Sequence, residues 1–559
     1  MSKKDIIRKL NYVKETKNMF KDKLISRNLD VTDSTPFSEY PKKISFLYRT
    51  PPKYGAVFQS IMPLVDNNGT VYFGEVEPWV FDGVSEGNNI VTIDPNAMKG
   101  ICIGNKGLVE VKLDNLITAG NNALSQAFEN CINLVKINLD NLRTPVLYRT
   151  FANCINLSDI GNFGQYFVGK VPGSSLNSTF KGTKIKSLNL SGVTIGGANS
   201  AFTSMCQDCT ELESVDFSNL ERFAYEGMSN TFNGCTKLKT VLMPKVNLSS
   251  NGTFFGTFTN CSSLENIDLS GVTMLGETGN MLNCFNSTFM GNTKLNNVNL
   301  NNLIPVNVPD NTFYMTFKNC TALTYNPINI RYIESVGDRA FEGTFGNSGL
   351  SGTISFDSLR IATTSNSQGK FESCFSGTPN LKEISFPVLE EGIDAGSSST
   401  PGRTYFSHMA FSSGIRKISF PQLRTNNIGT CFYQMCANCT NLTDVDFSSL
   451  ETTSSLGLDF QETFRNCMSL EEVRFPALKN IPGADTFINT FYNCTNLKKV
   501  YFNSLEAAHT SAFNAMFNSQ CTNLTEVHFP ARSQSLVETL TGYASRFGAP
   551  STCQILFDL

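Results

Sequence analysis

Hydrophobic positions recur along most of the chain in one fixed order. In the stretch "DTFINTFYNCTNLKKVYFNSL" the apolar positions are Phe487, Phe491, Cys494, Leu497, Val500, Phe502 and Leu505. The same order is found in about sixteen units centred between Leu108 and Leu524, at intervals of roughly 23 to 34 residues, which is within or slightly above the range of leucine-rich repeats. The pattern therefore predicts a repeat protein.

Each part of the unit predicts its own local structure. Two aromatic residues four apart are typical of one face of a short helical turn. The run Leu-x-x-Val-x-Phe ends with a period of two, which predicts a short strand with Val and Phe pointing inward. Two residues after the second aromatic stands Asn or Gly, which tolerate the left-handed conformation that ends a helix. These positions are Asn130, Asn153, Gly182, Gly234, Asn260, Gly291, Asn319, Gly377, Asn438, Asn466 and Asn493.

A single unit cannot fold alone. A unit buries about six large apolar side chains at roughly 1.5–3 kcal/mol each, whereas ordering its backbone costs about 1–2 kcal/mol per residue. Stacking on neighbours is therefore required, and we expect an α/β repeat solenoid over residues 98–530 with a parallel β-sheet on one face. Residues 46–97 contain turn signals and are predicted to form a connector or N-terminal cap, and residues 531–559 a C-terminal cap.

Two C-x-x-C pairs, Cys206–Cys209 and Cys436–Cys439, have the spacing of a zinc half-site or a redox dithiol. Cys209 and Cys439, however, occupy the ordinary Cys position of the repeat. Cys206 and Cys436 fall where other units carry the second aromatic. Because a small, soft hydrophobe suits a stacked core position, we interpret all four as core cysteines and expect no metal and no cofactor.

The run "FYNCTNLKKVYFNSL" resembles the BspA-like leucine-rich repeats of bacterial, protist and phage surface proteins. The resemblance covers about residues 98 to 530 and is repeated across the array. The units at Ile185, Leu350 and Ile415 depart from it, because each has one residue fewer between the aromatic and the Leu position. In the unit of Cys521, the Cys follows one extra residue. This resemblance implies adhesion and partner binding, and it implies no catalytic residues.

The N-terminal segment, residues 1–45, differs from the repeats. Residues 2–26 are predicted to form an amphipathic helix, because Ser2 and Asp5 resemble a capping box and apolar residues follow one stripe. The stripe consists of Ile6, Leu10, Val13, Phe20 and Leu24. Such a helix either packs on its own domain or docks onto a larger assembly. The following stretch "LDVTDSTPFSEYPKKISFL" resembles a segment near the start of many phage tail and fibre proteins.

Composition and motifs exclude several functions. The net charge of -3 gives no basic surface for nucleic acid. The sequence contains no run of 18 apolar residues, so we expect no membrane insertion. The N-terminus lacks the apolar core of a secretory signal. The three His, at 408, 509 and 528, are scattered, and there is no phosphate-binding loop or dinucleotide fingerprint. The sequence therefore predicts a protein that is not an enzyme.

We expect a phage virion protein, a tail or head fibre that binds the host cell surface through its solenoid. Its predicted partners are other virion proteins through the N-terminus and a host surface protein or glycan through the solenoid, with homo-oligomerisation possible. A virion protein is released by lysis and needs no export signal. The alternative is a bacterial cell-surface adhesin of the BspA-like type, located on the cell surface instead of the virion.

The predicted receptor surface lies in the C-terminal third, between about 390 and 530. Solenoids bind through exposed strand faces and inserted loops. The outward strand position is mostly small or acidic, but it changes to Arg474, Tyr501 and His528, with Lys499 beside them. A Gly/Ser/Pro-rich interval adds Arg403, Tyr405 and Phe406 as further candidates. The alternative is that these residues are neutral variation on a solvated face.

Overall fold

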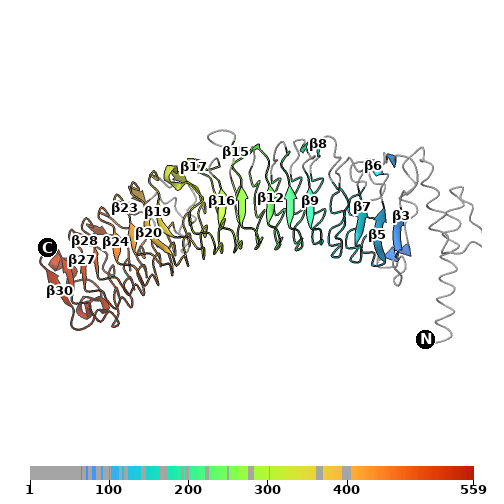
Figure 1. Cartoon of the computed structure of the whole chain (residues 1–559). Coiled ribbons are helices and arrows are strands. Elements are labelled where there is room, and N and C mark those ends of the chain that lie inside the picture. Colours follow the sequence, from blue (N-terminus) through green and yellow to red (C-terminus); the bar gives the residue numbers. More distant parts are fainter. Residues whose placement is uncertain are drawn as a thin grey trace, which may run out of the picture. The chain divides into compact units, whose positions relative to one another are not determined.

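The computed structural model describes the greater part of the repeat region and the C-terminal residues. The described residues are 64–65, 71–72, 79–82, 90–91, 100, 102–112, 116–118, 124–139, 147–163, 170–171, 174–190, 194–195, 200–220, 226–248, 251–274, 282–300, 303–360, 369–392, 405–426 and 429–559. They fall into two compact units, divided between Glu221 and Arg222, and in each unit the described chain advances through successive coils (Figure 1). The predicted helix over residues 2–26, with its apolar stripe, and most of the predicted connector lie outside the described residues.

The first unit carries two lines of short strands, one in each of two positions of the coil. Its described strands are β1 (Leu64–Val65), β2 (Val71–Tyr72), β3 (Trp79–Asp82), β4 (Ile90–Val91), β5 (Leu108–Lys112), β6 (Leu116–Thr118), β7 (Lys136–Asn138), β8 (Lys170–Val171), β9 (Ser187–Asn189), β10 (Thr194–Ile195) and β11 (Ser214–Asp216). The pairs β3–β5, β5–β7, β9–β11, β4–β6 and β8–β10 are parallel, and β1–β2 is antiparallel.

The second unit repeats this arrangement and ends in short helical turns. Its described strands are β12 (Thr240–Leu242), β13 (Val246–Leu248), β14 (Asn266–Asp268), β15 (Val272–Met274), β16 (Asn297–Asn299), β17 (Asn307–Val308), β18 (Ser335–Val336), β19 (Gly352–Ser355), β20 (Leu381–Ser385), β21 (Glu391–Gly392), β22 (Lys417–Ser419), β23 (Thr425–Asn426), β24 (Asp444–Asp446), β25 (Glu472–Arg474), β26 (Asn480–Ile481), β27 (Lys499–Tyr501), β28 (Ala507–Ala508), β29 (Glu526–Phe529) and β30 (Gln554–Phe557). Its helices are η3 (Ile330–Tyr332), η4 (Ala531–Ser533), α3 (Gln534–Val537) and η5 (Tyr543–Gly548). In the described part of the chain no helix has the length and apolarity needed to cross a membrane.

Parallel pairing in the second unit keeps equivalent repeat positions side by side. In β20, β22 and β24, for example, Ile384 faces Ile418, which faces Val445. The sheets β19–β20–β22–β24 and β25–β27–β29–β30 both follow this rule. The inward Val and Phe of the predicted strand are buried, as Val473 and Phe475 illustrate. The predicted parallel β-solenoid of leucine-rich-repeat type is therefore confirmed.

The aromatic segment of the coil is not helical, which corrects the α/β prediction. Between Phe460 and Asn466, alternate backbone N–H groups bond to the next coil, whereas the intervening ones bond to the carbonyl three residues earlier. Leu458, Glu462 and Asn466 have φ of 61°, 54° and 59°. A left-handed residue at every fourth position turns the backbone outward each time, so the segment is a chain of β-turns. We call it the turn segment.

The predicted left-handed Asn and Gly positions are all confirmed. Each has positive φ, from 58° at Asn260 to 81° at Gly234 and Gly291. The Asn side chains also bond along the stack, since the amide of Asn493 donates to Asn466 (2.9 Å), whose amide donates to Asn438 (2.6 Å). The Asn is therefore selected both for its backbone and for its side chain.

Buried Thr and Cys donate to carbonyls of the preceding coil. The hydroxyl of Thr490 donates to Phe460 O (2.8 Å), and the thiol of Cys494 donates to Phe464 O (3.0 Å). Two of the four C-x-x-C thiols make the same contact, since Cys209 donates to Phe180 O and Cys439 to Ala410 O, both at 2.9 Å, and Cys206 and Cys436 are also buried. Packing explains these cysteines, and each of the 17 Cys is buried.

Cys206 and Cys436 stand in the column of the second aromatic, as predicted. The bond from Phe180 N to Met205 O aligns Phe180 with Cys206, the residue after Met205, in the next coil. In the same way, the bond from Cys436 N to Thr463 O aligns Cys436 with Phe464. In two shortened units, at Ile185 and Ile415, a hydroxyl replaces the absent repeat thiol. Thr183 in the first of them donates to Phe180 O (2.8 Å).

Phenylalanine rings stack from coil to coil and form the core. In the second unit, one column follows the first aromatic of the repeat with centroid distances of 5.0–5.9 Å. Its members are Phe254, Phe285, Phe313, Phe341, Phe371, Phe406, Phe432, Phe460, Phe487 and Phe513. A second column follows the strand Phe and meets the first edge to face, as Phe475 meets Phe487 at 5.4 Å. Ring stacking across coils therefore replaces the leucine packing of a simpler repeat.

Candidate functional site

Arg474, Tyr501 and His528 form a stacked column on the outward face of β25, β27 and β29. Parallel register places Arg474 opposite Tyr501 and Tyr501 opposite His528. The guanidinium carbon of Arg474 lies 3.8 Å from the centroid of the Tyr501 ring, and the His528 ring stacks on the other side at 4.4 Å. The three predicted residues are thus brought together, and the column combines a cation–π contact with ring stacking.

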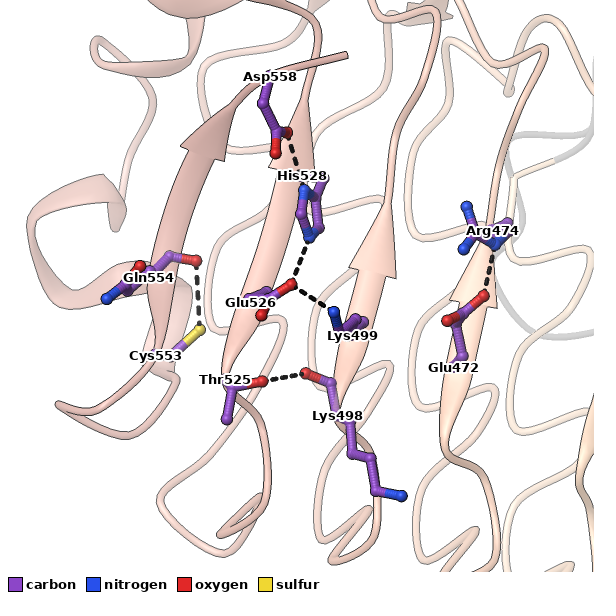
Figure 2. A network of polar contacts seen from close by, with 10 residues as sticks. All are labelled: Glu472, Arg474, Lys498, Lys499, Thr525, Glu526, His528, Cys553, Gln554 and Asp558. Carbon is purple, nitrogen blue, oxygen red and sulfur yellow. Dashed lines mark hydrogen bonds and ion pairs between the residues drawn. The ribbon is translucent and has the colours of Figure 1, made fainter.

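Carboxylates contact both ends of this column (Figure 2). Glu526 accepts from Lys499 Nζ at 2.7 Å and lies 2.9 Å from His528 Nε2. On the other ring edge, His528 Nδ1 lies 2.8 Å from Asp558, just after β30. The Lys499 ammonium and the His528 ring lower the pKa of Glu526, and the hydrogen bond to Glu526 raises the pKa of Lys499. The column is therefore tied to the C-terminal strand.

Burial changes what this column can offer to a partner. The sequence placed Tyr501 and His528 on an exposed face, but they are only 8% and 6% exposed. Long side chains on adjacent strands cover one another, because neighbouring strands are about 4.8 Å apart. The exposed member is Arg474, whose side chain is 50% accessible and pairs with Glu472. The accessible chemistry is therefore a guanidinium backed by an aromatic ring.

Tyr405 and Phe406 do not lie on an exposed loop, which corrects their predicted placement. They are 4% and 5% exposed. Phe406 takes the first-aromatic position and stacks between Phe371 (5.5 Å) and Phe432 (5.9 Å). These residues therefore belong to the core. The sequence analysis missed this because the Gly/Ser/Pro-rich interval lengthens the spacing to the next repeat unit. Arg403, the third candidate of that interval, lies outside the described residues.

A half-exposed polar and aromatic patch on the turn segments was missed by the sequence reasoning. It consists of His408, Tyr433, Gln434, Glu462, Arg465 and Tyr492, from four successive coils, and we call it the turn-face patch. A helical interpretation of the turn segment could not identify its outward positions. In the structure, burial along the coil of Phe460 repeats every four residues, with two buried residues followed by two partly exposed ones, which places residues one, two and five after the first aromatic outward.

The parallel strands, the stacked coils and the inward Leu, Val and Phe define a solenoid protein of the leucine-rich-repeat class. Among the described residues no group of His, Cys, Asp and Glu is arranged to hold a metal ion.

The family follows from the repeat itself. The model of the BspA type leucine rich repeat region matches residues 102–226, 176–345 and 405–541. These matches include most of the chain, which therefore belongs to the BspA-type leucine-rich-repeat family. Among curated proteins, none matches this chain.

Solved structures of other leucine-rich-repeat proteins are similar to this chain at low identity. A leucine-rich repeat protein from Bacteroides ovatus is 20% identical, with 82% of this chain and 85% of that chain covered and a TM-score of 0.37. A leucine rich cell surface protein from Faecalibacterium prausnitzii is 16% identical, with 80% and 83% covered and a TM-score of 0.23. An internalin from Listeria monocytogenes is 14% identical, with 58% and 76% covered and a TM-score of 0.20.

Proposed function

We propose that this chain is a non-catalytic binding protein of the adhesin type, which attaches its carrier to a cell surface through the solenoid. One observation carries the proposal. The core positions repeat with little change, whereas the outward strand position changes from small and acidic residues to Arg474, Tyr501 and His528 at β25–β29. A scaffold that varies at outward positions is typical of repeat proteins that bind partners.

Arg474 is the proposed centre of the strand-face contact. Its guanidinium is held in place by Tyr501 at 3.8 Å and by Glu472, so less side-chain freedom is lost on binding than for a solvated arginine. Arginine is also enriched among residues that dominate binding energy. Lys499, fixed by Glu526, supplies a second cation beside it.

The strand-face proposal is tested with fluorescent full-length protein and a panel of bacterial and mammalian cells, read by flow cytometry. We expect binding to at least one cell type and a loss of tenfold or more for Arg474→Ala. Lys498→Ala is the matched control, because it removes an exposed ion pair with Glu471 nearby and should bind like the parent. Binding to no cell would contradict the adhesin function, and full binding by Arg474→Ala would contradict the strand-face site.

The proposed carrier is a phage virion, in which the chain is a tail or head fibre that docks through residues 1–45 onto other virion proteins. The support is the stretch "LDVTDSTPFSEYPKKISFL", which resembles the start of phage tail and fibre proteins. The second candidate is a bacterial cell surface, which the BspA-type repeats favour.

Mass spectrometry distinguishes the two carriers. Peptides of this chain in purified, nuclease-treated particles support the virion, whereas peptides released by mild protease from intact bacteria support the cell surface. For the virion, a chain lacking residues 1–45 should fold but fail to incorporate. Normal incorporation of that truncated chain would contradict docking through the N-terminus.

A further inference from the structure

We infer that the turn-face patch binds a neutral polysaccharide, extended across the coils that carry Phe406, Phe432, Phe460 and Phe487. The inference rests on the proposed binding function but not on the strand-face surface. It assigns a second contact surface and a chemical class of ligand.

The patch is a continuous chain of contacts. The His408 ring meets the Tyr433 ring edge to face at 5.1 Å. The amide of Gln434 donates to the Tyr433 hydroxyl (3.1 Å) and to Glu462 (2.9 Å). Glu462 also accepts from Arg465 at 2.8 Å.

The chain of contacts ends on Tyr492, whose ring lies under the Arg465 guanidinium at 4.9 Å. Each of the six patch residues is partly exposed, from Glu462 with 13% of its side chain accessible to Arg465 with 42%. They are fixed by one another without being buried. A ligand therefore meets a surface that is already ordered, which reduces the entropy lost on binding.

The chemistry of the patch matches hydroxyl-bearing rings. Gln434, Glu462 and Arg465 are planar polar groups, and the donors and acceptors that their mutual bonds leave over suit adjacent hydroxyls on a sugar ring. The partly exposed faces of Tyr433 and Tyr492 suit its apolar C–H face. Glu462 and Arg465 neutralise each other, and burial lowers the pKa of His408, which favours the uncharged imidazole at neutral pH. A neutral surface of this kind disfavours strongly anionic polymers.

The geometry of the stack selects an extended polymer. Tyr433 and Tyr492 lie two coils apart, which corresponds to about 10 Å measured along the stack at the strand spacing. That separation is close to the length of one disaccharide unit in an extended polysaccharide. The adjacent Tyr and Gln are not repeated in two other coils of the second unit: the equivalent residues are Asn286 and Ser287 in the coil of Phe285, and Tyr314 is followed by Met315 in the coil of Phe313.

Affinity electrophoresis of the full chain tests the inference. Native gels contain dextran, mannan, xylan, laminarin or mixed-linkage β-glucan, and retardation relative to a gel without polysaccharide measures binding. The test variant is Tyr433→Ala with Gln434→Gly. Gln434 has a φ of 48°, which glycine adopts without strain, so the backbone tolerates the change. The matched control, Tyr314→Ala with Ser287→Gly, alters the same repeat positions in other coils.

We expect retardation by at least one of these polysaccharides, a loss of tenfold or more in affinity for the test variant, and unchanged retardation for the control. Equal circular dichroism and melting temperature must accompany the comparison. Retardation by none of the five, or equal retardation of the test variant, overturns the inference. The gels contain no cells, so failure of the adhesin function remains distinguishable.

Discussion

At the residue scale, the turn segments depend on left-handed residues at every fourth position. Many of them are not glycine: Arg149, Met315 and Glu462 have φ of 52°, 51° and 54°. A residue with a Cβ in this conformation costs roughly 1–2 kcal/mol. The cost is offset by the hydrogen bond that its N–H makes to the next coil, as Glu462 N does to Ile488 O at 3.1 Å.

Asn466 allows the backbone and side-chain contributions to be separated. We expect Asn466→Gly to destabilise by about 1 kcal/mol, because it keeps the left-handed backbone but removes two hydrogen bonds of the Asn ladder. Asn466→Ala should cost about 1 kcal/mol more, from backbone strain. Urea unfolding measures both. Equal stability of the two variants would contradict the role assigned to the left-handed backbone.

The buried thiols should resist alkylation while the protein is folded. Burial raises the pKa of Cys131, Cys284 and Cys320 to about 12, so at pH 8 these groups are protonated as well as inaccessible. Iodoacetamide at pH 8, followed by intact-mass measurement, should add fewer than one label per chain in buffer and 17 in urea. Rapid labelling of the folded chain would show that some cysteines are not core residues.

At the element scale, the strands could be predicted from the sequence and the turn segments could not. A period of two that ends in Val-x-Phe has one common structural interpretation, and β25 and β27 follow it. Aromatic residues four apart are compatible with a helix and with a chain of four-residue turns. The choice is made by hydrogen bonds to the next coil, which no local pattern reports.

The candidate site shows the same division. Arg474, Tyr501 and His528 share one repeat position, so their adjacency followed from the sequence. Their exposure could not be predicted from the sequence, because it depends on how far each side chain extends over the next strand. The turn-face patch could not be predicted for a related reason, since its outward positions depend on the turn geometry.

Phe464 tests the ring columns. It is fully buried and stacks on Phe491 at 5.7 Å. We expect Phe464→Ala to lower the free energy of unfolding by about 3–5 kcal/mol, because the truncation leaves a cavity in the core. Phe464→Leu should cost less than half as much. A loss below about 1 kcal/mol for the alanine variant, measured in urea, would mean that this column does not support the core.

At the scale of the whole molecule, each coil contacts mainly its neighbours, so stability is close to a sum of local terms. The end of the second unit shows how such a stack is closed. Phe547 of η5 meets Phe513 at 5.6 Å, and β30 pairs with β29. Asp558 adds a polar tie to His528. The last coil is therefore covered by elements that do not follow the repeat.

Deletion of one complete coil should be tolerated. Removing residues 467–493 joins Asn466 to Cys494 and restores the repeat, because equivalent Asn positions are 27 residues apart here. We expect the shortened chain to be folded, with a cooperative melt within about 5 °C of the parent, since each remaining coil keeps two neighbours. The matched control removes residues 467–480, half a coil, and should be insoluble. Similar behaviour of both deletions would contradict a stack of interchangeable coils.

The hydrogen bonds from Phe460, Glu462 and Asn466 to the next coil have a mechanical consequence. Strand and turn segments both bond along the stack, and among the described residues the backbone bonds of a coil reach only its immediate neighbours. A pulling force on the second unit therefore detaches one terminal coil at a time. Each 27-residue coil lengthens the chain by up to about 90 Å and leaves an intact template for its return. Under tension we therefore expect the second unit to unfold in steps, one coil at a time.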